Sequence, residues 1–117
     1  MTAKPAIDRE TLRLIKQVIL EEANKQGIKV EKIILFGSRA RGDHGEDSDY
    51  DILVIVREGI DWRTKNKLYA RIHRRLVREL RAPIDLLIVT AQWFYENASN
   101  KVTFEAEVAE TGVELPM

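Results

Sequence analysis

The chain has 117 residues, enough for one domain with one modest hydrophobic core. Hydrophobic residues make up 44% of it and charged residues 32%, a balance typical of a globular protein and not of a disordered chain. Because it contains no cysteine, disulfides, thiolate catalysis and cysteine-ligated zinc are excluded, and no apolar run approaches the roughly 20 residues that span a bilayer. We therefore expect a single domain over residues 1–117 of a soluble, cytoplasmic protein with no membrane association.

The formal net charge is +0, but the charges are unevenly distributed along the chain. Residues 61–81 contain eight Lys or Arg against two acids, whereas residues 82–117 contain one base against six acids. Blocks of this kind are most often solvated faces. The alternative is a basic face on residues 61–81 that binds RNA or an acidic partner, although nucleic acid is not the expected ligand.

The first half of the chain predicts a helix followed by a strand. Asp8 is a suitable N-cap, apolar residues then recur at helical spacing, and Gly27 is a natural helix end. Residues 30–36 finish in a run of four apolar side chains that is typical of a buried strand. A glycine interrupts the strand, Ser38 is predicted to cap a short helix, and residues 43–48 are predicted to form a polar loop.

The second half of the chain predicts two further strands and three helices. Residues 50–56 are too apolar for a strand with an exposed face, and Asp61 is expected to cap a long helix with an apolar stripe at four-residue spacing. Residues 84–89 form the third predicted strand, Thr90 caps a helical segment, and a final helix covers residues 100–111. This order predicts an α/β (α+β) fold in which a small mixed β-sheet packs against α-helices.

Three acids lie at the beginning of predicted strands. Asp49 and Asp51 point to the same face because strand side chains alternate, and two steps of about 3.3 Å place their backbones roughly 7 Å apart. Asp85 enters an apolar run, where a buried carboxylate would cost several kcal/mol without a cation or a strong donor. Its position at the start of the strand, and not in the middle, places it at a rim of the sheet. Carboxylates suit Mg²⁺, and two metals about 3.5–4 Å apart are the usual device for displacement at phosphorus.

These acids can meet the glycine-serine turn in only one arrangement of the strands. Gly37 and Ser38 lie at the C-terminal end of the first strand, whereas Asp49 and Asp51 lie at the N-terminal end of the second, so the first strand must run antiparallel to the second. Asp85 also lies at the N-terminal end of its strand, so the third strand must run parallel to the second. One end of a mixed sheet would then gather all of these residues.

The glycine-serine turn is itself a candidate phosphate site. Gly37 would allow a phosphate to approach the backbone, and the start of the following helix offers free N–H groups and a favourable dipole. The Ser38 hydroxyl can donate to a terminal phosphate. Arg39 and Arg41 can add positive charge, although either could pair with the acids of the loop instead.

The acids of this region allow two other interpretations. They could form a solvated turn that enters a strand. A solvated turn does not explain why the glycine-serine turn and the third acid are expected at the same end of the sheet, so this interpretation is less favoured. A calcium loop of EF-hand type fits part of the spacing of Asp47, Asp49, Asp51 and Glu58, but it requires glycine where Ile52 stands.

The spacing of the turn and the acids resembles the GS-x10-DxD signature of the polymerase-β-like nucleotidyltransferases. The matching residues are Gly37, Ser38, Asp49 and Asp51, with Asp85 in the place of the third acid. The short chain is similar to the minimal nucleotidyltransferases, many of which are the antitoxins of toxin–antitoxin pairs whose toxin is a small all-helical HEPN protein. The resemblance implies a nucleotidyltransferase fold for residues 1–117.

The resemblance also implies an activity, namely Mg²⁺-dependent transfer of a nucleoside monophosphate from ATP to a hydroxyl with loss of pyrophosphate. Asp49 and Asp51 would bind two Mg²⁺ ions, and Asp85 would help to bind one of them and take the proton of the attacking hydroxyl. Gly37 and Ser38 would hold the triphosphate. In the antitoxin members the acceptor is a tyrosine of the toxin.

The acceptor and the oligomeric state stay open at this point. Transfer to a small molecule such as an aminoglycoside, with a homodimer (a possible homo-oligomer) completing the pocket, is one alternative. A protein that neutralises a toxin by binding alone, with its acidic C-terminal part covering a basic ribonuclease surface, is another.

Overall fold

The structure is a computed structural model, and it describes residues 8–42, 45, 48–98 and 104–116. Most of the polar loop predicted at residues 43–48 and the first part of the final predicted helix lie outside the described residues. In the described ranges, no helix combines the length and the apolar character needed to cross a membrane.

Helices and strands alternate along the described chain much as predicted. The helices are α1 (Arg9–Lys25), α2 (Gly37–Arg41), α3 (Trp62–Leu80), α4 (Ala91–Ala98) and α5 (Phe104–Thr111). The strands are β1 (Val30–Phe36), β2 (Tyr50–Val56), β3 (Ile84–Thr90) and β4 (Val113–Glu114). The first three strands match the predicted ranges to within one residue. The sequence does not predict β4, because two residues are too few to show an alternating pattern.

The strands form one mixed sheet in the order β3-β2-β1-β4. β1 runs antiparallel to both β2 and β4, and β3 runs parallel to β2. α3 connects the two parallel strands, as such a pair requires a long crossover. The predicted strand directions, with the first strand antiparallel and the third parallel to the second, are therefore confirmed.

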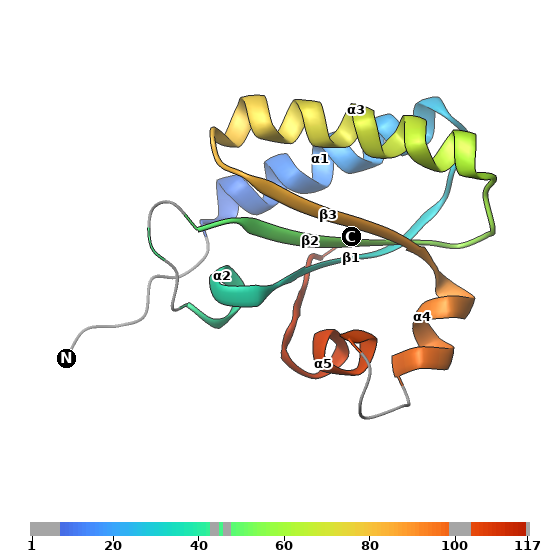
Figure 1. Ribbon diagram of the computed structural model, residues 1–117. Coiled ribbons are helices and arrows are strands. Elements are labelled where there is room, and N and C mark those ends of the chain that lie inside the picture. The colour runs from blue at the N-terminus through green and yellow to red at the C-terminus, as the bar shows by residue number, and fades with distance from the viewer. Residues whose placement is uncertain (1–7, 43–44, 46–47, 99–103, 117) are drawn as a thin grey trace.

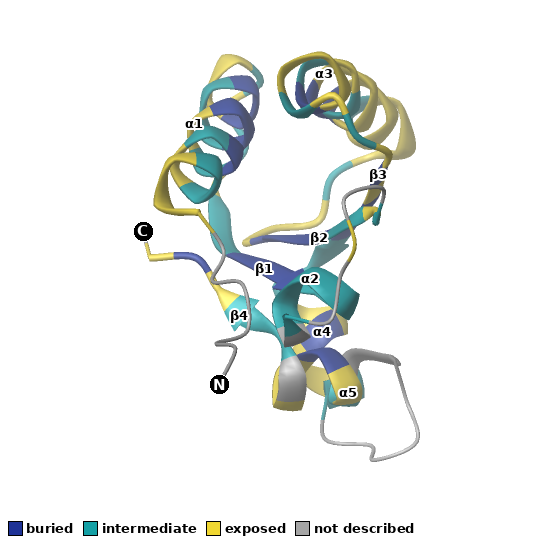
Figure 2. Cartoon of the chain, turned by 90° about the vertical axis from the view of Figure 1, so that its left-hand side faces the viewer, coloured by how far each residue is buried: buried dark blue, intermediate teal, exposed yellow. Residues whose placement is uncertain are grey.

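Helices cover both faces of the sheet (Figure 1). α1 and α3 lie side by side on one face, and α4 and α5 lie on the other. Successive residues of β2 alternate between the two: Ile52 and Val54 join the core under α1 and α3, while Leu53 and Ile55 pack with Phe94 of α4. Figure 2 shows this burial at the centre of the molecule. A strand buried on both faces has a continuous apolar sequence, which explains the apolar run of β2.

Three of the predicted helix caps are confirmed. Asp8, Asp61 and Thr90 each accept, through a side-chain oxygen, an N–H of the following helical turn, at 3.1, 2.7 and 3.1 Å. Gly27 follows the C-cap of α1 with a φ of +69°, which is the left-handed conformation expected just after a helix.

The predicted cap of α2 is wrong. The helix begins at Gly37, and the extended Phe36 takes the N-cap position without a side-chain hydrogen bond. Ser38 is the second residue of the helix, and its carbonyl accepts from the Gly42 N–H at 2.9 Å. The reason is that Gly37, with a φ of +75°, turns the chain one residue earlier than a serine cap would.

A cluster of charges joins α1 to α3. Glu22 is only 3% exposed, yet Arg75 Nη1 donates to its Oε2 at 2.7 Å and Lys25 Nζ lies 3.3 Å from the same oxygen. Arg75 Nη2 also donates to Glu21 Oε1 at 3.0 Å. Burial raises the pKa of Glu22, but the hydrogen bonds from Arg75 and Lys25 outweigh it and hold this pKa below its usual range. The carboxylate therefore stays charged between the two helices.

Replacing Arg75 tests this cluster. Arg75→Ala should lower the free energy of unfolding by about 2 kcal/mol, because it leaves Glu22 buried with only Lys25 as a partner. This is less than the loss from a fully buried pair, since the Arg75 side chain is 26% exposed. Urea denaturation followed by circular dichroism measures the change. Arg74→Ala, at an exposed side chain with no ion pair to a described residue, should cost less than about 0.5 kcal/mol, and equal losses would contradict the role of Arg75.

Candidate active site

Strand register brings two of the predicted acids together. Asp51 of β2 is the register partner of Asp85 on β3, and on its other side it is the partner of Phe36 on β1. Register partners on adjacent strands point to the same face of a sheet, so the two carboxylates are neighbours. Asp49 stands two residues before Asp51, just ahead of β2, and the alternation of the strand assigns it to the same face.

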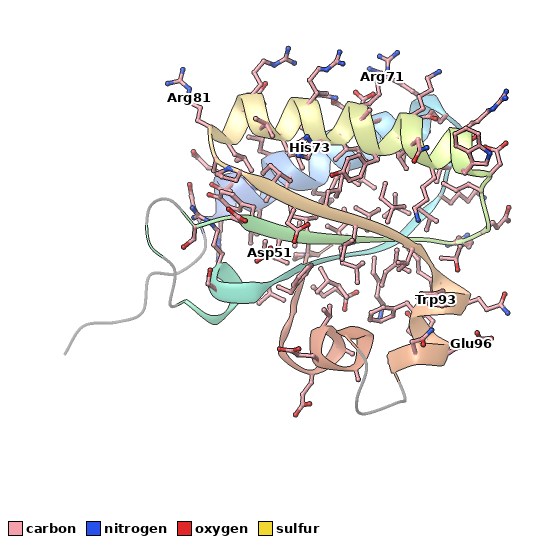
Figure 3. The ribbon with its side chains drawn as sticks, viewed as in Figure 1. Asp51, Arg71, His73, Arg81, Trp93 and Glu96 are labelled. Carbon is pink, nitrogen blue, oxygen red and sulfur yellow. The ribbon has the colours of Figure 1, made fainter. Side chains whose placement is uncertain are left out.

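The acids lie on the face of the sheet that α4 and α5 cover. Leu53 and Ile55 follow Asp51 at steps of two residues, and both are buried with Phe94 of α4. The acids stand at the opposite end of β2 from this packing, where β1 ends and α2 begins (Figures 1 and 3). The predicted gathering of the turn and the acids at one end of the sheet is therefore present.

Gly37 and Asp51 are in direct contact. A Cβ atom at Gly37 would overlap Asp51 Oδ2 and lie 2.9 Å from its Cγ, so the carboxylate occupies the space that any other side chain would fill. The φ of +75° at Gly37 is also a conformation that favours glycine. Both the backbone and the neighbouring carboxylate therefore require glycine at this position.

The start of α2 lies against this contact. The first N–H groups of a helix have no partner within the helix, and they are suited to bind an anion. Ser38 is half-buried in the first turn of α2, next to Gly37 in the chain. The structure thus brings Gly37 and Ser38 to the acids, and phosphate binding by them stays a prediction.

Arg39 contacts the segment that carries the acids. Its Nε donates to the Ser48 carbonyl at 3.0 Å, and its guanidinium carbon lies 3.8 Å from the centre of the Tyr50 ring. These contacts tie α2 to the chain on either side of Asp49. Sequence analysis did not predict this role of Tyr50. The sequence showed only that Tyr50 stands between two aspartates, and that strand alternation points its ring to the face opposite theirs. The side chain of Arg41 lies outside the described part of the structure.

Asp85 is exposed, as is Asp49, whereas Asp51 is half-buried. This exposure agrees with the expected position of Asp85 at the start of its strand, on the rim of the sheet. β3 is an edge strand, and its side chains alternate between buried and exposed, with Leu87 38% exposed. Asp85 is accordingly accessible to a ligand at the edge of the sheet.

The donor set fits Mg²⁺ bound together with a substrate. Among the described residues, no three His, Cys, Asp or Glu side chains form a ready-made metal site. Mg²⁺, however, is usually held by one or two carboxylates plus substrate phosphates, and not by a cage made of protein alone. Asp51 and Asp85, with Asp49 close by in sequence and a glycine turn beside them, offer such an arrangement of oxygens.

Comparison with known proteins shows the family to which the chain belongs. The family model for "Polymerase beta, Nucleotidyltransferase" matches residues 16–115. "Putative protein adenylyltransferase MJ0141" from Methanocaldococcus jannaschii is 31% identical over 106 residues, which are 91% of this chain and 99% of that protein. The chain therefore belongs to the polymerase beta nucleotidyltransferase family.

Solved structures share the fold. The structure of a "putative minimal nucleotidyltransferase" aligns with a TM-score of 0.57 and 25% identity, over 95% of this chain and 97% of that one. A toxin–antitoxin crystallised with AMP-PNP aligns with a TM-score of 0.56 and 22% identity, over 86% of this chain and 72% of that chain. The second likeness concerns the fold alone.

The contact between Gly37 and Asp51 predicts the effect of adding one methyl group. Gly37→Ala should cost about 1–3 kcal/mol of stability, because alanine is strained at positive φ and its Cβ must displace the Asp51 carboxylate. Gly59→Ala is the matched control, since nothing lies within 4 Å of a Cβ there and its φ is not positive. Urea denaturation of both variants measures the difference, and an unchanged stability of Gly37→Ala would rule out the contact.

Proposed function

We propose that the protein is an Mg²⁺-dependent adenylyltransferase that moves AMP from ATP to a tyrosine hydroxyl of a small helical HEPN toxin. It would thereby act in the cytoplasm as the antitoxin of the pair. The single observation that carries this proposal is the register pairing of Asp51 with Asp85 beside Gly37. Two carboxylates next to a turn that can admit a phosphate are the parts that nucleotidyl transfer requires.

A protein acceptor is supported by the relative from Methanocaldococcus jannaschii. Its name describes a protein adenylyltransferase, and this chain matches 99% of its length. The toxin as partner rests on the resemblance of the sequence to minimal nucleotidyltransferases, which the structural likeness at 25% identity extends.

The residues of the site divide the reaction between them. The backbone at Gly37 and the hydroxyl of Ser38 would donate hydrogen bonds to the triphosphate. As the tyrosine oxygen bonds to the α-phosphorus, Asp85 would accept its proton and the bond to pyrophosphate would break. Asp49, Asp51 and Asp85 would hold Mg²⁺, which neutralises charge on the attacking and leaving oxygens.

Transfer can be tested with ATP labelled on the α-phosphate and the protein encoded by the neighbouring reading frame. The wild type should label this partner, and Asp85→Asn should lower the rate about 10²–10⁴-fold because the proton acceptor is lost. Glu58→Gln is the matched control, since it removes an exposed acid beyond the far end of β2 and should keep the full rate.

The same variants separate catalysis from simple binding. If Asp85→Asn binds the toxin with wild-type strength and still neutralises it, the protein is a binding antitoxin and the catalytic proposal is wrong. Labelling by Asp85→Asn at the wild-type rate would contradict the role given to the carboxylate.

A further inference from the structure

α3 carries an exposed cation on every turn of one face. The residues follow one another at intervals of three or four: Arg63, Lys67, Arg71, Arg74, Arg78 and Arg81. At 3.6 residues per turn the five inside the helix fall within an arc of about 80° and span roughly 23 Å, and Arg81 follows them as the C-cap. Every residue of α3 within that arc is Lys or Arg. We call these six residues the α3 basic stripe.

The cations of the stripe have no acidic partners among the residues that the structure describes. None of the six makes an ion pair with a residue that the structure describes. Arg75, on the neighbouring side of α3, contrasts with them because it bonds to both Glu21 and Glu22. Figure 3 shows Arg71 and Arg81 projecting from α3 away from the sheet. The stripe is therefore a solvent-facing row of positive charge that does not hold the fold together.

Helix physics gives no reason for this row. Like charges three and four residues apart repel each other, and Glu79 is the single acid within α3. Arg78 and Arg81 complement the negative C-terminal end of the helix dipole, but Arg63 and Lys67 stand near the positive N-terminal end, where cations are unfavourable. An external anion would offset the repulsion along the whole row.

A groove of about 630 Å³ runs beside the stripe, between α1 and α3. Four cations of the stripe line it, together with Lys25 of α1. The acids in its lining are Glu21 and Glu22, and both are bonded to Arg75. Since these acids are already paired, the groove presents net positive charge to a ligand.

We propose that the α3 basic stripe and this groove bind the phosphate backbone of a single-stranded nucleic acid. A straight row with one cation per turn of about 5.4 Å matches a linear polyanion. The arc has no apolar side chain, so it lacks the apolar centre of a typical protein interface. The stripe also faces away from the sheet, whose other face carries Asp51 and Asp85. This binding goes beyond the proposed adenylyl transfer and does not depend on it.

Fluorescence anisotropy with a labelled 20-nucleotide oligouridylate tests the proposal between 50 and 300 mM NaCl. If all six cations contact phosphates, the plot of log K against log salt should have a slope of about −4 for the wild type. The variant K67Q/R71Q/R74Q/R78Q should bind at least about tenfold more weakly, and its slope should be shallower by about 3. Circular dichroism should show both proteins folded, because these side chains make no ion pairs with described residues.

A matched variant distinguishes binding by the stripe from a general effect of the protein's net charge. R9Q/R13Q/K29Q/R57Q removes the same number of exposed cations from other parts of the surface, and it should keep the wild-type slope to within about 1. Equal losses in the two variants, or no binding by the wild type at 50 mM NaCl, would overturn the proposal. Displacement of the oligonucleotide by polyglutamate at equal charge concentration would also overturn it, since that result identifies an acidic protein as the ligand.

Discussion

The register of β2 between its two neighbours is the constraint on which the rest of the structure depends. β2 is buried on both faces, so its pairing fixes the core and the site together. A slip of one residue would turn Asp51 into the layer where Ile52 and Val54 now pack under α1 and α3, and it would separate Asp51 from Asp85. The same burial that stabilises the sheet therefore also holds Asp51 beside Asp85.

Much of this arrangement could be predicted from the sequence, because a site that contains the glycine turn and all three acids allows few strand directions. Once Gly37 and the three acids were taken as one site, only one set of strand directions could bring them together, and the structure has it. What could not be predicted depends on neighbours distant in the chain. The sequence placed Asp85 at a rim but did not show that β3 is an edge strand, and the stacking of Arg39 on Tyr50 brings α2 against the first residue of β2.

The zero net charge of the chain conceals two surfaces of opposite character. The sheet separates them: the acids lie on the face that α4 and α5 cover, and the α3 basic stripe lies outside the other layer. Arg75, a cation of α3 outside the stripe, forms ion pairs with both Glu21 and Glu22 of α1. Because the two surfaces are on opposite sides, binding of an ATP-sized ligand at one leaves the other accessible.

The most direct test of the site is calorimetric titration with AMP-PNP, with Mg²⁺ and with EDTA, on the wild type and on the double variant D51N/D85N. If these carboxylates hold the metal beside the nucleotide, Mg²⁺ should tighten binding to the wild type by about tenfold or more and leave the double variant nearly unaffected. In EDTA the order should reverse, because the variant no longer repels the triphosphate. An equal effect of Mg²⁺ on both proteins would contradict the account.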